Sequence, residues 1–282
     1  MAGMNTTQFH GLVNGRRKRR KPEAAIGLHC QIGALLAFLS VRAEALPACL
    51  PPAEIPKARV LGVDAGGTLL LERNRAARFE GLLWPSTGRE PVPSALRQQA
   101  MAALRQLVGK QATLRAAAPK LDRYGRLRVQ VILSDGKWLQ REILRRGLAR
   151  VQVAPDRPDC ARELYAAEAL ARNAHAGLWA LPQYAIRNPD ALRWQDLGSF
   201  QIVQGQVLTV KVNGSRAYLN FGRDWRTDFT VTISPEDMRT FRHAGVDPYG
   251  YAGKTVRVRG YVDRLHGFEI EAASPEAIEV LR

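Results

Sequence analysis

The chain has 282 residues, of which 46% are apolar and 24% charged, and this balance shows no bias toward intrinsic disorder. Its formal net charge is +16, and residues 46–282 alone carry 35 Lys/Arg against 24 Asp/Glu, a net +11. A basic surface attracts polyanions because binding releases their counterions. Nucleic acid or an anionic polymer of the cell envelope is therefore one expected partner, and the alternative is a charge that serves only solubility.

Residues 1–45 have the three parts of a secretory signal peptide. A basic run at 16–21 precedes an apolar stretch at 32–41, and Ala43, Glu44 and Ala45 form a small-x-small cleavage pattern. The apolar stretch is too short to span a bilayer as a helix. We therefore expect an exported protein, periplasmic or secreted, without a transmembrane helix in its mature chain. The alternative is a basic nucleic-acid-binding tail on a cytoplasmic protein.

Export leaves two cysteines in the mature chain, Cys49 and Cys160, since Cys30 lies within the signal. Two distant cysteines in an oxidising compartment commonly pair, which would tie the N-terminal arm to the start of a helix. A second interpretation treats residues 46–49 as a lipobox with Cys49 acylated, although Pro47 weakens that pattern. The histidines are scattered and offer no zinc spacing.

The elements follow in chain order. Four prolines in residues 46–56 predict an extended linker. Loose apolar alternation over 58–71 predicts a hairpin, and 78–83 a further strand. Helical periodicity runs from Ser94, a suitable N-cap, to Gly109. Strands are predicted at 112–116 and 127–133, and helices at 138–146 and 162–175. Residues 57–181 are thus predicted to form an α+β domain, a small β-barrel with three helices.

A second β-rich module is predicted after a polar linker at 182–197. Strands are expected at 201–212, 216–221, 228–233, 255–262 and 267–272. A helix is expected to follow Ser234 as its N-cap. Five short strands with one helix between the third and fourth are the order of an OB-type barrel, so residues 198–282 are predicted to form a smaller OB-like module.

A specific motif begins at Asp122-Arg123-Tyr124-Gly125-Arg126. It continues through a strand, an Asp-Gly turn, Gly147-Leu148-Ala149-Arg150-Val151 and a helix that carries Tyr165 and Glu168 before Gly177-Leu178-Trp179. In motif, order and spacing this resembles the thermonuclease (staphylococcal-nuclease-like) family. The resemblance implies an OB-fold nuclease barrel that hydrolyses phosphodiesters of DNA or RNA. In that family carboxylates hold one Ca²⁺, a Glu acts on the attacking water, and two arginines neutralise the phosphate.

Carried over position by position, the resemblance keeps the arginines and loses the carboxylates. Arg78 and Arg126 match the two phosphate-facing arginines, whereas Gly67 and Leu83 stand at metal-ligand positions and Ser86 at the general base. Leucine cannot coordinate calcium, and serine is a poor base beside a carboxylate. We therefore expect a catalytically degenerate barrel that needs no cofactor and binds a polyanion or a protein partner.

The alternative is an active Ca²⁺-dependent nuclease in which Asp64 and Glu80 serve as displaced ligands. The simpler expectation is that Glu80 pairs with Arg78. Arg123 and Tyr124 are further candidates for nucleic-acid contact.

The remaining aromatic residues have structural explanations by default. Glu168 and Trp179 are expected in the core, as are Trp138, Trp194 and Trp225. Residues 216–226 mix aromatic and basic side chains, a composition that suits single-stranded nucleic acid on an OB face. The interpretation we favour for them is docking against the first barrel.

Overall fold

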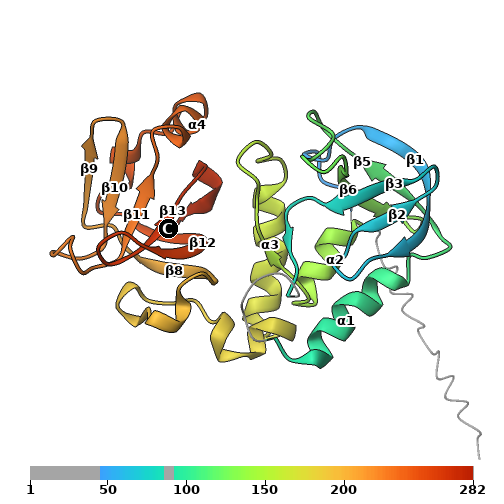
Figure 1. Ribbon diagram of the computed structural model, residues 1–282, viewed down its shortest axis with the longest axis horizontal. Coiled ribbons are helices and arrows are strands. Elements are labelled where there is room, and N and C mark those ends of the chain that lie inside the picture. Colours follow the sequence, from blue (N-terminus) through green and yellow to red (C-terminus); the bar gives the residue numbers. More distant parts are fainter. Residues whose placement is uncertain (1–44, 86–91, 282) are drawn as a thin grey trace, which may run out of the picture. The chain divides into compact units, whose positions relative to one another are not determined.

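The computed structural model describes residues 45–85 and 92–281 (Figure 1). The predicted signal peptide and Ser86 lie outside these residues. Within the described part of the chain, no helix combines the length and apolarity needed to cross a membrane.

The first barrel is built from β1 (Ala53–Val63), β2 (Leu69–Leu71), β3 (Arg75–Phe79), β5 (Gln111–Arg115) and β6 (Leu127–Leu133). These strands close in the order β1-β2-β3-β6-β5 (Figure 1). All neighbours are antiparallel except β3 and β6, which are parallel. Alternate residues of each strand fill the interior with aliphatic side chains that are almost inaccessible to solvent. The predicted barrel is confirmed.

Three helices accompany this barrel, as expected: α1 (Ser94–Arg105), α2 (Leu139–Arg145) and α3 (Ala161–Asn173). Ser94 is the first helical residue rather than the N-cap, which is Pro93. The two-residue strands β4 (Leu82–Leu83) and β7 (Arg150–Val151) pair outside the barrel. Gly147 is required where α2 ends, because a Cβ there would overlap the carbonyl oxygen of Ala176, and the Gly147 carbonyl accepts from Leu178.

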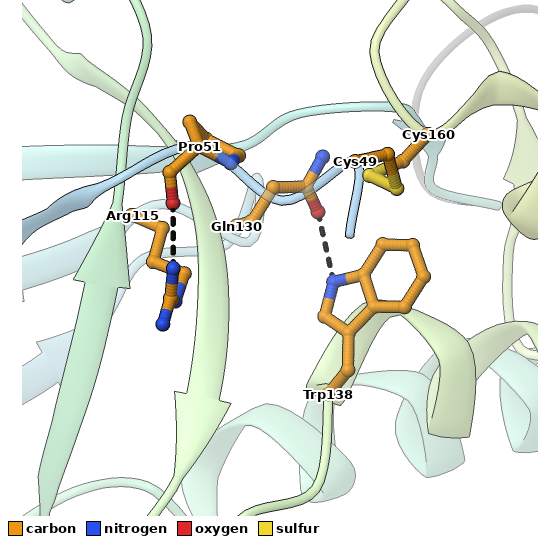
Figure 2. Close-up of a disulfide and its surroundings, with 6 residues drawn as sticks. All are labelled: Cys49, Pro51, Arg115, Gln130, Trp138 and Cys160. Carbon is orange, nitrogen blue, oxygen red and sulfur yellow. Dashed lines mark hydrogen bonds between the residues drawn. A yellow bond between two sulfur atoms is a disulfide. The ribbon is translucent and has the colours of Figure 1, made fainter. Parts of the chain in front are cut away.

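The N-terminal arm, residues 46–56, was expected to be an extended linker, and it is fastened to the barrel. Cys49 and Cys160 form a disulfide beside the buried pair of Trp138 and Gln130 (Figure 2). Figure 2 also shows the Arg115 guanidinium donating to the Pro51 carbonyl, at 2.8 Å. The apolar side chains of the arm pack on the core, and its last residues belong to β1. Because the Cys49 sulfur is bonded to Cys160, the acylated-cysteine interpretation is wrong for this state of the chain.

The second barrel contains β8 (Phe200–Gln206), β9 (Thr209–Asn213), β10 (Arg216–Asn220), β11 (Thr230–Ile233), β12 (Thr255–Arg264), β13 (Phe268–Glu271) and β14 (Ile278–Val280), with helix α4 (Asp237–His243). Its order is β9-β10-β11-β13-β12, and β8 pairs with β12. Since β8 and β9 are separated only by Val207 and Leu208, this bent segment pairs with β12 at one end of the order and with β10 at the other. The pair β11–β13 is parallel, as β3–β6 is in the first barrel. Both barrels therefore share one strand order, and the predicted OB-like module is confirmed.

Three details of this module differ from expectation. The strand predicted at 201–212 bends into β8 and β9, which lets one segment pair with β12 at one end and β10 at the other. The edge strand β14 was not predicted. Helix α4 begins at Asp237 rather than directly after Ser234, whose hydroxyl accepts from the Asp237 N–H at 3.1 Å.

A buried ion pair links α3 with β12. The Glu168 carboxylate, fully buried, accepts from the Val151 N–H at 2.7 Å and from the Arg259 guanidinium at 3.0 Å. The same guanidinium lies over the Tyr165 ring, 4.0 Å from its centroid. The motif residue Glu168 is thus a core residue, as expected, and its charge is balanced by a residue of the second barrel.

Candidate nucleic-acid face of the first barrel

The parallel pair β3–β6 places the predicted arginines on one surface. Ala77 and Leu127 are paired and face the core, so Arg78, Arg126 and Arg128 point to the opposite face of the sheet. Arg78 lies beside Arg128 in the register. The Cα atoms of Arg78 and Arg126 are therefore about 8 Å apart, from two residues of strand rise and one strand spacing. We call this surface, with the adjoining turn at 122–126, the arginine face.

The turn that holds Arg126 is organised by Asp122. One carboxylate oxygen accepts from the backbone N–H groups of Tyr124 and Arg126, and the other accepts from the Arg126 guanidinium at 2.8 Å. Burial by itself raises the pKa of Asp122, but these hydrogen bonds outweigh it and hold the pKa below its ordinary value. The carboxylate is therefore charged at neutral pH and fixes the direction of Arg126.

Tyr124 projects from this turn into solvent. Its ring is 66% exposed and lies 4.9 Å from the Arg123 guanidinium carbon and 5.1 Å from that of Arg126. Arg126 also reaches the Thr68 hydroxyl on the first hairpin, at 3.5 Å. An exposed ring beside guanidinium groups can stack on a base while the cations meet phosphate.

Arg78 is the least constrained of the three arginines that β3 and β6 place on this face. Its side chain is exposed, and among the described residues no ion pair or hydrogen bond engages its guanidinium. The expectation that Glu80 pairs with Arg78 is wrong. Glu80 is buried and bonded at 2.7 Å to Arg128, which comes from the neighbouring strand.

Arg128 is in turn held by Asp156 through two hydrogen bonds of 2.5 and 2.9 Å. The hydrogen bond from Arg128 holds the pKa of Asp156 below its ordinary value, although burial opposes it. Sequence analysis missed this group of three charges. The alternation of Leu127, Arg128, Val129 and Gln130 does place Arg128 on the outward face of β6, but it does not reveal the partners.

The two positions expected to hold the metal, Gly67 in the first hairpin and Leu83 in β4, provide no side-chain oxygen. A Cβ added at Gly67, which has φ +82°, would lie 3.0 Å from the Trp84 indole nitrogen. The buried Trp84 ring, in edge contact with Phe79, thus occupies the space that a longer side chain at Gly67 would enter. Calcium requires several oxygen ligands, including charged ones, so these residues do not fit it.

Both carboxylates considered as displaced ligands are engaged in other contacts. Asp64 uses one oxygen to accept from the N–H groups of Gly66 and Thr68, at 2.9 and 2.7 Å, which closes its own hairpin. Glu80 is committed to Arg128. Elsewhere in the described residues, the one group with metal-ligand proximity is Cys49, Cys160 and Glu163, and both of its sulfurs are in the disulfide.

Comparison with known families agrees with this architecture. Residues 85–181 match the model of the family described as staphylococcal nuclease homologue. The matched segment includes Arg126 and the motif through Trp179, and it begins after Arg78, Gly67 and Leu83. A comparison with curated proteins found no match. The chain therefore carries a thermonuclease-like domain of the staphylococcal nuclease homologue type.

Proposed function

We propose that this protein is an exported, non-catalytic member of the thermonuclease-like fold that binds a polyanion, nucleic acid first among them, through the arginine face. The observation that carries the proposal is the pairing of retained arginines with a metal site that lacks carboxylates. An exposed Arg78, Arg123 and Tyr124, together with the directed Arg126, provide contacts for phosphate and for a base.

The absence of catalysis is supported by the engagement of both candidate ligands. Moving Asp64 toward a metal would break two backbone hydrogen bonds, and moving Glu80 would leave Arg128 half paired in a buried place. The Trp84 ring stands where a ligand at Gly67 would lie. The second candidate function, a Ca²⁺-dependent nuclease that uses Asp64 and Glu80, has to use their remaining carboxylate oxygens or exchange these contacts.

Incubation with single-stranded and duplex DNA, with Ca²⁺ and with a chelator, distinguishes the two functions. We expect no degradation above a mock purification in either condition. Cleavage that stops with chelator, and stops again in Asp64→Asn or Glu80→Gln, would overturn the non-catalytic proposal. Asp156→Asn is the matched control for Glu80→Gln, because it also removes one partner of Arg128 without touching a candidate ligand.

A salt titration tests polyanion binding by the same face. The affinity should fall as salt rises, and Arg78→Gln or Arg123→Gln should each weaken binding and reduce the slope by about 0.7 to 0.9. Arg239→Gln on α4 removes the same charge from an exposed place on the second barrel and should leave the slope from this face unchanged. Absence of binding at low ionic strength would favour a purely structural or protein-binding role.

Export is supported by the disulfide between Cys49 and Cys160, since such bonds persist in oxidising compartments. Fractionation of cells that express the full chain tests this part of the proposal. We expect a shortened protein in the envelope or the medium that has no free thiol to react with a blocking reagent. A full-length protein with free thiols in the cytoplasm would contradict export and favour the basic-tail interpretation of residues 1–45.

A further inference from the structure

A second candidate site lies on the outward face of the second barrel, over β9, β10 and β11. These three strands lie side by side in Figure 1. The register places Tyr218 between Lys211 on β9 and Thr232 on β11, and Asn220 between Thr209 and Thr230. These side chains alternate with the buried Ala217 and Leu219, so they point away from the core.

This face is hollowed into a cleft of about 360 Å³, within the range of small-ligand pockets. Its walls include residues of three strands and of two loops, the one that follows β10 and the one between β12 and β13. Polar and aromatic side chains line most of this cleft, and they include Lys211, Tyr218, Asn220, Trp225, Thr230 and His266. Strand faces and adjoining loops of this kind are where OB barrels bind extended polymers.

Trp225 is the main ring of the cleft, and its exposure contradicts our expectation that it is buried. It is 47% exposed, with the His266 ring in edge contact at 5.0 Å and the Arg226 guanidinium 4.9 Å from its centroid. These two neighbours hold the indole at the mouth of the cleft without covering it. We favoured residues 216–226 as a surface that docks on the first barrel. Within the described part of the chain, the hydrogen bonds cited for that contact come instead from Arg259 and Glu276.

The side chains that line the cleft carry a net positive charge. Among the described residues that line it, Lys211 is a full cation and no side chain is a carboxylate. Acidic residues flank this lining on two sides: Asp224, next to Trp225, accepts from the Arg226 N–H at 3.0 Å, and Glu269 on β13 accepts from Thr232 at 3.2 Å. A polyanion on this face would therefore place phosphate at Lys211 on β9 and beside Arg226, while its bases face the rings.

We propose that this cleft is a binding site for single-stranded nucleic acid, with bases stacked on Trp225 and Tyr218 and phosphate held by Lys211 and Arg226. The inference does not depend on the arginine face of the first barrel. Stacking of bases on aromatic rings depends little on base sequence, so the site should accept single strands of varied sequence. It should exclude duplexes, because their bases are already paired and stacked.

Intrinsic fluorescence of the full, disulfide-bonded chain provides a direct test with a single-stranded oligothymidylate of eight nucleotides. Trp84, Trp138 and Trp179 are buried, so quenching should come from an exposed indole. Trp225→Ala should remove the quenching and weaken binding of the single strand about 5- to 150-fold, the range for loss of one stacked base. Trp225→Phe should keep most of the affinity, because its ring can still stack.

Trp194→Ala is the matched control, since Trp194 is also exposed, also lies beside an arginine and does not line the cleft. It should leave the affinity unchanged. Arg78→Gln combined with Arg123→Gln should weaken duplex and single strand alike, whereas Trp225→Ala should weaken the single strand alone. This difference separates failure of the cleft from failure of the arginine face.

Three results would overturn the proposal: quenching by a neutral oligosaccharide such as maltohexaose but not by the oligonucleotide, equal loss of single-strand affinity in Trp194→Ala and Trp225→Ala, or full affinity in Trp225→Ala. Tyr218→Ser and Lys211→Gln provide independent variants on different strands. The first should lower affinity with the salt slope unchanged, and the second should reduce the slope by about 0.7.

Discussion

Replacing Arg259 by methionine would remove the cation that balances Glu168 between α3 and β12. Arg259 is buried, and it donates to Glu168 at 3.0 Å and to Glu279 at 2.6 Å. Burial alone would lower the pKa of Arg259, but Glu168 and the other neighbouring acidic groups raise it, so the guanidinium is charged in the folded protein. Methionine keeps most of the aliphatic volume and deletes the charge.

The expected cost follows from what remains around Glu168. Removing one partner of a buried ion pair costs about 3 to 5 kcal/mol, because the other charge stays buried. Glu168 would keep the Val151 N–H at 2.7 Å and a longer contact to Arg172 at 3.3 Å. These contacts place the expected loss near the lower end, about 3 kcal/mol, a large part of a typical stability of about 5 to 15 kcal/mol.

Urea denaturation of the full chain, followed by circular dichroism, measures this loss. The double variant Glu168→Gln/Arg259→Met should be more stable than the sum of the two single changes predicts, since the second change no longer strands a charge. Arg257→Met is a control on the same strand, with a longer 3.9 Å contact to Glu279. A loss below about 0.5 kcal/mol in Arg259→Met, or additive single changes, would refute the reasoning.

Three further predictions concern the first barrel. Cys49→Ser opens a loop with a sequence separation of 111 and should lower the unfolding free energy by about 4 to 5 kcal/mol, and reductant should then have no further effect. The pKa of Asp122 is lowered in the folded protein. The stability that this carboxylate provides is therefore present above its unfolded pKa near 3.9 and is lost as pH falls through the lower folded pKa. Asp122→Asn should flatten this loss of stability in acid denaturation curves. Gly67→Ala should lower the unfolding free energy more than Gly136→Ala does, since both glycines have φ near +80° but only Gly67 lies against Trp84. Equal losses would show that Trp84 does not crowd Gly67.

The sequence by itself determined the elements whose interactions are local. The turn at 122–126 could be recognised because its hydrogen bonds join residues no more than four apart. The order of strands and helices, and hence two barrels in succession, followed from apolar periodicity and from glycine and proline positions. The candidate cysteine pair was also visible, because only two cysteines remain in the mature chain.

Tertiary structure decided which charges meet. Glu80 is separated from Arg128 by 48 residues, and only the parallel pairing of β3 with β6 brings them to 2.7 Å. No local pattern distinguishes that partner from Arg78, two residues away. A buried carboxylate pairs with the cation that the strand register brings next to it. Spacing in the sequence therefore predicted the wrong partner for Glu80.

The same reason applies to the rings and to the basic charge. Trp225 was expected to be buried by default, yet it lines a cleft, whereas Trp84 occupies the space beside Gly67. Burial of a large side chain depends on which strands close around it, and that closure is a property of the whole barrel. The sequence established a basic chain with a nuclease-like motif, and the fold decided where its cations and rings are exposed.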